Sequence, residues 1–263
     1  MIPESTGVTK RYIRYADPND VSSTPHWGVL EDGTVEELAL EPFDGEQRTG
    51  TQTRLEEVRL LAPTTPSKIL AVGRNFRSHL HGHEAPSEPG LFAKMPSSLI
   101  GPGDPIVIPP DAQDLHFEGE LVIVIGKLTR NVTTEEASEH VFGVTAGNDV
   151  SERAWQDQDL QWLRAKGSDS FGPMGPVLVS GGDYDDLLIE TRVNGETLQS
   201  ERSRDLIFPV EEVISFASRY FTLFPGDAIY TGTPGSTSAL NPGDRVEVKV
   251  EGVGTLENPV VVA

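Results

Sequence analysis

Three Pro-Gly-Asp triplets constrain the fold of this chain more than any other feature of its sequence. They occupy residues 102–104, 225–227 and 242–244, and a short apolar run follows each of them. Proline fixes φ at the first central position of a β-turn, and glycine supplies the positive φ of the second. Each triplet therefore predicts a tight turn that leads into a strand. The run after the third triplet, residues 245–250, alternates polar and apolar side chains and predicts a half-buried strand.

Helix signals are few by comparison. Thr133 and Glu136 have the spacing of a capping box, which predicts the start of a helix. Residues 210–221 place apolar side chains on one helical face, and the stop signal Pro225-Gly226 follows them. Many strands, few helices and turns rich in glycine and proline predict an α+β fold that is mostly β.

Residues 1–62 differ in pattern from the rest of the chain. They are acidic and weakly patterned, and they contain a predicted hairpin that turns at Asp32-Gly33. A proline-rich link follows at residues 63–66, and strand signals then become frequent. We therefore predict a small N-terminal β-rich region at 1–62 and a catalytic domain at 63–263.

The charge of the chain limits its partners. Asp and Glu number 41 against 21 Lys and Arg, which gives a formal net charge of −20. Such a surface repels phosphate backbones and anionic lipid, so neither nucleic acid nor a membrane is an expected partner. The sequence has no cysteine, no signal-peptide pattern and no apolar run near the ~20 residues that span a bilayer, which favours a cytoplasmic location.

The strongest chemical signal is a pair of acids in an otherwise apolar strand pattern at residues 117–126. Glu118 and Glu120 stand two residues apart, so they project from one face of the strand, about 7 Å apart. Two close carboxylates repel each other unless a cation lies between them. The alternative is a solvated strand edge that carries two surface acids.

Asp149, which follows the apolar run 141–144, adds a third carboxylate. Three oxygen ligands suit Mg²⁺, Mn²⁺ or Ca²⁺, with water or substrate completing the shell. Three carboxylates around a dication leave a net negative charge, so an anionic substrate would need a nearby cation, for which Lys166 is the candidate. The alternatives are that Asp149 is a helix N-cap and that Lys166 is an ordinary surface lysine.

Alternating histidines form the second chemical signal. His79, His81 and His83 invite interpretation as a zinc site, although the order expected of a metallo-β-lactamase-like site is not matched. Downstream histidines occur only at positions 116 and 140. A second interpretation makes one imidazole a general base, because imidazole titrates near neutrality. A third is a polar loop without a chemical role.

Five blocks of sequence, taken in order, resemble the fumarylacetoacetate hydrolase (FAH) superfamily. The blocks are residues 71–79, 117–121, 148–153, 165–169 and 231–234. The resemblance covers about residues 66 to 263 and includes 172–176 and 254–258. It is strongest to the small members, which include acylpyruvate hydrolases, oxaloacetate decarboxylases and isomerase/decarboxylases of aromatic degradation.

The resemblance implies a fold and a site. The fold would be a mixed β-roll with short flanking helices, usually in a homodimer. The cofactor would be Mg²⁺ or Mn²⁺. The implied site residues are the metal ligands Glu118, Glu120 and Asp149, the catalytic Lys166, the lid residue His79, and the substrate contacts Arg74, Gln156 and Thr233.

The lid departs from the family pattern at one position. Family members usually carry a glutamate three residues after the lid histidine, and that position is Gly82 here. The nearest acids are Glu84 and Glu88, and we predict that Glu84 partners His79. The departure bears on hydrolysis in particular, because hydrolytic members use the His–Glu dyad to activate water.

The implied function is metal-dependent C–C bond cleavage of a small anionic β-diketo or 2-oxo acid through a metal-stabilised enolate. Acylpyruvate- or fumarylpyruvate-type hydrolysis and oxaloacetate-type decarboxylation both fit this description. Lys166 would offset developing negative charge, and His79 would deprotonate an attacking water. Three alternatives stay open: an isomerase/decarboxylase of 2-hydroxy-dienoates, a zinc hydrolase that uses the 79–83 histidines, and a non-catalytic member that binds metal without turnover.

Overall fold

The computed structural model describes residues 9–20 and 23–263, and its largest element is a 12-stranded sheet. Ten strands form its main path, in the order β4 (Arg48–Arg54), β3 (Thr34–Leu38), β2 (His26–Glu31), β1 (Lys10–Ala16), β14 (Gly172–Ser180), β12 (Val141–Asn148), β11 (Gly119–Ile125), β17 (Ala228–Tyr230), β6 (Ile69–Gly73) and β7 (Gly90–Lys94). Two strands pair beside this path, β5 (Arg59–Leu61) with β1 and β8 (Leu99–Ile100) with β14. The pairs β17–β6 and β14–β8 are parallel, and the others are antiparallel.

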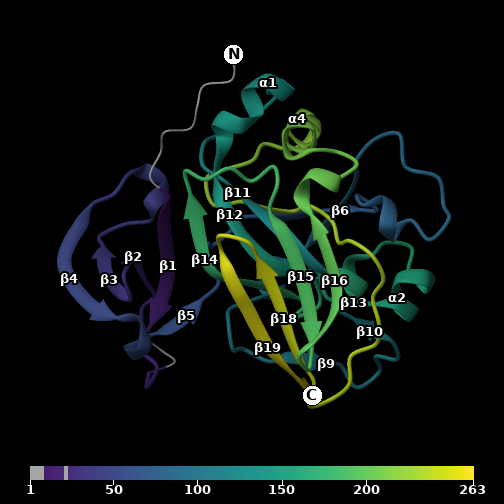
Figure 1. Ribbon diagram of the computed structural model, residues 1–263, viewed down its shortest axis with the longest axis horizontal. Coiled ribbons are helices and arrows are strands. Elements are labelled where there is room, and N and C mark those ends of the chain that lie inside the picture. The colour runs from purple at the N-terminus through teal and green to yellow at the C-terminus, as the bar shows by residue number, and fades with distance from the viewer. Residues whose placement is uncertain (1–8, 21–22) are drawn as a thin grey trace.

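A second sheet of five strands packs against the first. Its order is β16 (Glu196–Arg202), β15 (Leu188–Val193), β18 (Arg245–Val250), β19 (Gly254–Val262) and β9 (Ile106–Ile108). A short ladder joins β10 (Leu115–His116) to β13 (Ser151–Glu152). The two larger sheets share one core, in which Ile123 and Val144 of the first pack with Val248 and Leu256 of the second (Figure 1). This mostly β architecture confirms the predicted fold class.

The turns and helices follow the sequence signals. The glycines of the three Pro-Gly-Asp triplets all have φ between 79° and 91°, and β9, β17 and β18 follow them as predicted. The α-helices of the described residues are α1 (Thr134–Ala137), α2 (Arg153–Gln158), α3 (Leu163–Gly167) and α4 (Val210–Tyr220). The 3-10 turns are η1 (Pro42–Asp44), η2 (Leu55–Glu57), η3 (Arg77–His79), η4 (Pro96–Ser98), η5 (Ser138–His140) and η6 (Ser203–Asp205). The capping box at Thr133 is confirmed, because Thr133 and Glu136 bond each other reciprocally. Among residues 9–20 and 23–263, no helix is long and apolar enough to cross a membrane.

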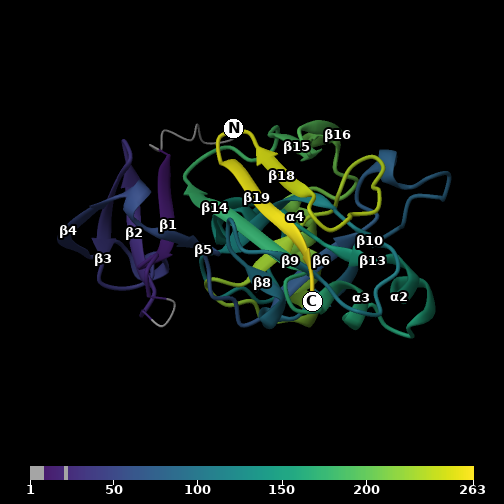
Figure 2. The same ribbon diagram turned by 90° about the horizontal axis from the view of Figure 1, so that it is seen from below.

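The N-terminal strands project from one side of the molecule. Figures 1 and 2 show β1 to β4, in purple and blue, as a separate lobe beside the main body. The predicted hairpin at Asp32-Gly33 is confirmed, since both residues have positive φ and join β2 to β3. Because β1 also pairs with β14, the large sheet runs through both predicted regions.

Candidate active site

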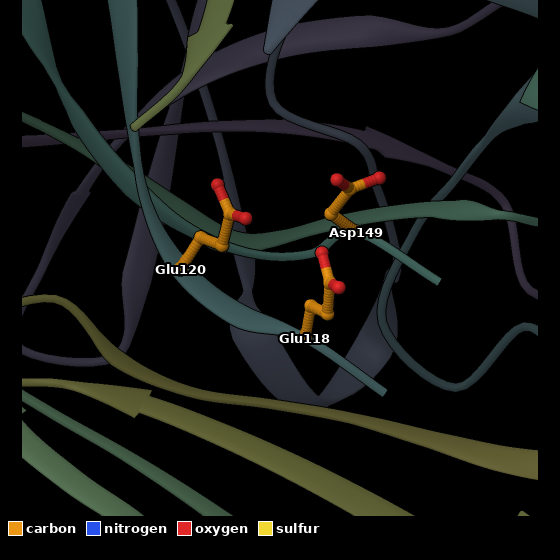
Figure 3. A group of neighbouring side chains, drawn as sticks. All are labelled: Glu118, Glu120 and Asp149. Carbon is orange, nitrogen blue, oxygen red and sulfur yellow. The ribbon is translucent and has the colours of Figure 1, made fainter. Parts of the chain in front are cut away.

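Strand register brings three carboxylates together. Gly119 pairs with Asn148 across β11 and β12, so Glu118 and Asp149 occupy the adjacent opposed positions, and the Asp149 N–H donates to the Glu118 carbonyl at 2.8 Å. Glu120 lies two residues along β11, on the same face as Glu118. One ligand atom from each of the three lies within 4.8 Å of the others, and Figure 3 shows the side chains pointing toward one another.

A glycine allows this strand to pack closely. A Cβ on Gly119 would lie 1.9 Å from the hydroxyl oxygen of Thr191 on β15. The absent side chain therefore lets β11 lie against the second sheet while Glu118 and Glu120 face the other way. All three carboxylates are at most 4% exposed, so the alternative of a solvated strand edge is wrong.

Three cationic side chains contact the carboxylates. Lys166 of α3 places its Nζ 2.6 Å from Glu118 Oε2 and 2.8 Å from Asp149 Oδ2. Arg153 of α2 lies 2.6 Å from Glu118 Oε1, and Lys94 of β7 binds Asp149 Oδ1. Lys166 is only 2% exposed, so the alternative that it is an ordinary surface lysine is wrong.

The capping alternative for Asp149 is also wrong. The side chain of Glu152, and not that of Asp149, accepts the Trp155 N–H as the N-cap of α2. The Asp149 carboxylate is occupied instead by Lys94 and Lys166. Its place is therefore in the carboxylate cluster.

The two glutamates of this cluster have opposite electrostatic environments. Burial favours the neutral form of Glu118, but the cations Lys166 and Arg153 outweigh burial and hold the pKa of Glu118 well below its usual range. Burial together with the charges of Asp149 and Glu118 raises the pKa of Glu120 well above its usual range. Glu120 accepts the Gly232 N–H at 2.7 Å and appears in no ion pair among the described residues. It is the carboxylate that lacks a cation.

The pKa values of the two buried lysines, Lys94 and Lys166, are also shifted in opposite directions. Burial lowers the pKa of Lys94 and outweighs the attraction of Asp149. For Lys166 the burial effect is again the largest single one, but the combined charges of Asp149 and Glu118 overcome it and raise the pKa. Lys166 therefore stays charged at neutral pH, because it contacts two carboxylates where Lys94 contacts one.

The cluster fits a divalent cation. Its donors are carboxylate oxygens, which Mg²⁺ and Mn²⁺ prefer. Glu120, raised in pKa by its neighbours and without a cationic partner, is the group that such an ion would satisfy. Three carboxylates and a dication would sum to −1, and Arg153 and Lys166 would bring the total to +1. With such an ion bound, the site would offer a local positive charge to an anionic ligand in a chain with a net charge of −20.

Glu118, Glu120, Arg153 and Lys166 line a cavity of about 580 Å³. The predicted residues that line it, besides the two glutamates and Lys166, are Arg74, His79, Gln156 and Thr233. Gln156 accepts a hydrogen bond from Arg153 at 2.8 Å, and Thr233 donates to the Gly119 carbonyl at 2.9 Å. Both contacts hold the walls of the cavity in place.

His79 faces the carboxylates through one nitrogen. Its Nδ1 lies 2.7 Å from the Gly235 carbonyl, which only accepts hydrogen bonds, so Nδ1 carries the proton. Its Nε2 is then a free acceptor and lies 4.0 Å from Glu118 Oε1. Burial lowers the pKa of His79, which keeps the imidazole neutral and able to take up a proton.

The structure does not bring Glu84 to His79. Glu84 and Glu88 are both exposed, and neither lines the cavity. His81 and His83 do line it, but among residues 9–20 and 23–263 the converging group of three metal-ligand side chains is Glu118, Glu120 and Asp149. The geometry thus gives no support to a zinc site built from the three histidines.

Sequence reasoning overlooked Lys94 and gave Arg153 no role. Arg153 stood inside the block 148–153, and its position four residues after Asp149 was the available signal. Lys94 ends the apolar run Leu91-Phe92-Ala93 and is the buried residue of β7, where a lysine would need a partner. His116, bonded to Asp114 and Thr237, also lines the cavity.

The raised pKa of Glu120 predicts how the metal-free protein responds to pH. The folded state keeps this proton to higher pH than the unfolded chain, whose glutamate has the ordinary value of 4.5, so this group lowers stability as pH rises above 4.5. Glu120→Gln should remove up to about 1.4 kcal/mol of destabilisation per pH unit in that window. Urea unfolding in chelator from pH 5 to pH 8 measures the difference between wild type and variant. Parallel pH profiles for the two proteins would show that Glu120 ionises normally.

A buried carboxylate triad with basic side chains around it, beside a cavity of a mostly β fold, is the kind of site that an enzyme uses. The chain belongs to the fumarylacetoacetate hydrolase family. Residues 68–261 match the family model described as Fumarylacetoacetate (FAA) hydrolase C-terminal, and residues 10–63 match the model described as Rv2993c-like, N-terminal.

Relatives support this membership. Protein Rv2993c of Mycobacterium tuberculosis is 41% identical over 259 residues, which cover 95% of this chain and 98% of the relative. Mitochondrial oxaloacetate tautomerase FAHD2A of Bos taurus is 40% identical over 220 residues, or 78% of this chain and 70% of the relative. The crystal structure of 5-carboxymethyl-2-hydroxymuconate delta-isomerase from Mycobacterium smegmatis aligns with a TM-score of 0.90 and 42% identity, covering 96% of this chain and all of that one.

Proposed function

We propose that this protein is a Mg²⁺- or Mn²⁺-dependent enzyme that cleaves a C–C bond of a small 2-oxo or β-diketo acid. The observation that carries the proposal is the buried cluster of three carboxylates and three basic side chains, of which Glu118, Glu120, Arg153 and Lys166 line the cavity. The net positive charge of the cluster with a bound dication favours a substrate that carries at least one carboxylate. The same cluster would stabilise negative charge that develops when the bond breaks.

Glu118, Glu120 and Asp149 would hold the metal ion. The ion supplies Lewis-acid stabilisation of a substrate oxygen when it is bound. Lys166 contributes a fixed positive charge, because its contacts with Glu118 and Asp149 keep the ammonium in one position beside the cavity. Such pre-positioned charge acts without reorganisation as negative charge builds up on the substrate.

His79 and Arg153 complete the proposed machinery. His79 Nε2 is unprotonated and would take the proton of an attacking water in a hydrolytic reaction. Arg153 bonds Glu118, Gln156 and Thr237, so it fixes one wall of the cavity. We propose Arg74, Gln156 and Thr233 as residues that contact the substrate, because all three line this cavity.

A second candidate function is tautomerisation or isomerisation of a 2-oxo acid at the same site. Two observations favour it. Similar proteins include an oxaloacetate tautomerase and a delta-isomerase. Glu84 is exposed and outside the cavity, and proton transfer between carbon and oxygen needs one base but no activated water.

One panel of substrates distinguishes these functions. After metal analysis of the purified protein, acylpyruvates, oxaloacetate and a 2-hydroxy-dienoate are incubated with it and Mg²⁺ or Mn²⁺. Formation of pyruvate or CO₂ supports C–C cleavage, whereas conversion of enol to keto acid without either product supports the second candidate. Metal binding without any turnover would indicate a non-catalytic member. Bound zinc, with activity lost on changing His81 or His83, would support the zinc hydrolase.

The lid prediction separates hydrolysis from decarboxylation. We expect Glu84→Gln to impair acylpyruvate hydrolysis about as severely as His79→Ala, by roughly 10²–10⁴-fold, because both would remove general-base activation of water. Since Glu84 is exposed, the segment between residues 80 and 89 would have to close over the substrate for this contact to form. Oxaloacetate decarboxylation should change far less, because it requires no attacking water.

The matched control is Glu88→Gln, which changes the other exposed acid of the segment. Both variants and His79→Ala are assayed on both substrates. Intact hydrolysis in Glu84→Gln together with lost hydrolysis in Glu88→Gln would identify Glu88 as the partner. If neither acid matters while hydrolysis is fast, the base acts without a lid carboxylate.

We also propose a homodimer and a cytoplasmic location. The dimer rests on the resemblance to the small family members, and analytical ultracentrifugation tests it. The location rests on the absence of cysteine in this sequence, and cell fractionation tests it.

A further inference from the structure

A second cavity adjoins the site. It has a volume of about 450 Å³ and shares Gly73, Arg74, Phe92 and Trp162 with the first cavity. The four shared lining residues place the two cavities next to each other.

The two cavities differ in chemistry. The first carries Glu118, Glu120, Arg153 and Lys166 on its walls. In the second, Arg74 is the charged residue among those that line it, and the rest are glycine, proline, leucine, glutamine and aromatic side chains. A polar head and an apolar tail would thus each meet a matching environment.

An aromatic pair stands where the cavities meet. The rings of Phe92 and Trp162 pack edge to face with centroids 5.4 Å apart. The Phe92 centroid lies 5.1 Å from Lys166 Nζ, so the apolar wall begins directly beside the charged cluster. A Cβ on Gly73 would lie 3.3 Å from the Trp162 ring, which shows that the ring rests against the backbone of β6.

The outer wall leaves large apolar side chains uncovered. Leu160, between α2 and α3, is 95% exposed, and the neighbouring Leu163 is 51% exposed. A leucine gains favourable free energy when it is removed from water. Leu160 has no such cover from the residues that the structure describes, although it lines the cavity beside the site.

We infer that the second cavity binds the distal acyl group of the substrate, and that the preferred substrates are 2-oxo acids with an alkyl or aryl tail. This inference rests on the proposed function, which places the 2-oxo acid group at the carboxylate cluster. The occupant follows from the position of the second cavity beside the site, because the tail of an acid held at the carboxylate cluster would extend past Phe92 and Trp162 into it. An acid that ends in a second carboxylate would have Arg74 as the one cation among the residues that line this cavity, and its charge would otherwise lie against leucine and tryptophan, which is unfavourable.

Binding of acids that are not 2,4-dioxo compounds tests the inference without turnover. Calorimetry with Mg²⁺ compares pyruvate with 2-oxooctanoate, whose tail is five methylenes longer. Each buried methylene contributes about fourfold in affinity, so we expect 2-oxooctanoate to bind at least about tenfold more tightly even if only part of the tail is buried. Equal affinities would overturn the inference.

Variants locate the tail. In Leu160→Ser and in Trp162→Ala the ratio of the two affinities should fall severalfold or more. Leu128→Ser is the matched control, because Leu128 is 61% exposed and follows the far end of β11 from Glu118. It should keep the wild-type ratio. An unchanged ratio in both cavity variants would show that the tail lies elsewhere.

Turnover separates this inference from the proposed function. Kinetics with 2,4-dioxo acids carrying a methyl, a pentyl or a carboxyvinyl tail should give the highest kcat/KM for the pentyl compound. Cleavage that favours the carboxyvinyl compound over the pentyl compound would overturn the tail inference and leave the proposed function standing. Tail-dependent binding without cleavage of any of these acids would support the tail inference and overturn the proposed function.

Discussion

Glu120→Gln is expected to reduce turnover by about 10³-fold or more and to abolish stabilisation by Mg²⁺ or Mn²⁺. Lewis-acid stabilisation by a metal ion is worth several kcal/mol in a transition state, and each 1.36 kcal/mol is about tenfold in rate. Glu120 is the carboxylate of the cluster that forms no ion pair among the residues that the structure describes, so the amide takes away a metal ligand without leaving a cation unpaired. The Gly232 N–H keeps an acceptor in the amide oxygen.

Thermal unfolding provides the readout that does not depend on activity. A ligand at 100 times its Kd stabilises a protein by about 2.7 kcal/mol, which raises Tm by roughly 5–10 °C in a chain of this size. Wild type should show this rise with metal, and Glu120→Gln should not. In chelator, Glu120→Gln should be at least as stable as wild type, because a buried carboxylate without a cation has been neutralised.

The matched control is Glu211→Gln. Glu211 is a half-buried carboxylate that bonds Tyr184 and does not line the site cavity. This variant should keep both turnover and the metal-dependent rise in Tm. Full activity of Glu120→Gln at saturating metal would remove Glu120 from the set of proposed ligands.

Changes at the other two ligands carry an additional cost. Asp149→Ala would leave Lys94 buried with the Lys166 carbonyl as its remaining partner, and Glu118→Ala would deprive Lys166 and Arg153 of a carboxylate. Breaking a buried ion pair by removing one partner costs about 3–5 kcal/mol. Both variants should therefore lose activity and stability together, in contrast to Glu120→Gln. This contrast follows from the ion pairs and is not visible from the spacing of the acids.

The sequence predicted those parts of the site that depend on local periodicity. Glu118 and Glu120 share a face because side chains alternate along a strand, and this alternation holds whatever the strand pairs with. The turns after the Pro-Gly-Asp triplets and the capping box at Thr133 were predictable for the same reason. Each of these features depends on residues fewer than five positions apart.

Contacts between distant segments were not predictable in this way. Lys94 reaches Asp149 across 55 positions because β6 pairs with β17 and carries β7 on its other edge, beside α3. Likewise, the pairing of β1 with β14 places the N-terminal strands in the large sheet, although residues 1–62 have a pattern of their own. The basic side chains Lys94, Arg153 and Lys166 reach the carboxylates through such long-range contacts. In the proposed function, they allow a strongly acidic chain to bind an anion.

Lys166→Met is expected to lower kcat by about 10²–10³-fold at saturating metal, the effect commonly seen when one group that stabilises an oxyanion is removed. Methionine keeps the length of the side chain and removes its charge. In wild type, Lys166 stays charged because Asp149 and Glu118 raise its pKa, so the loss should be similar at all pH values where the enzyme is folded. A lysine that acted as a proton donor or acceptor would instead give a variant with an altered pH profile.

Metal affinity distinguishes this effect from loss of the metal itself. The Lys166 ammonium lies within 2.8 Å of Glu118 and Asp149, where it repels a dication and competes for the same oxygens. Lys166→Met should therefore bind Mn²⁺ at least as tightly as wild type, while the stability of the metal-free variant falls because two buried carboxylates lose a partner. Metal titration by calorimetry and single-turnover kinetics measure the two quantities separately. Normal kcat in a variant that binds metal would show that Lys166 neutralises the cluster and takes no part in the reaction, because its charge would then matter to the fold and not to the transition state.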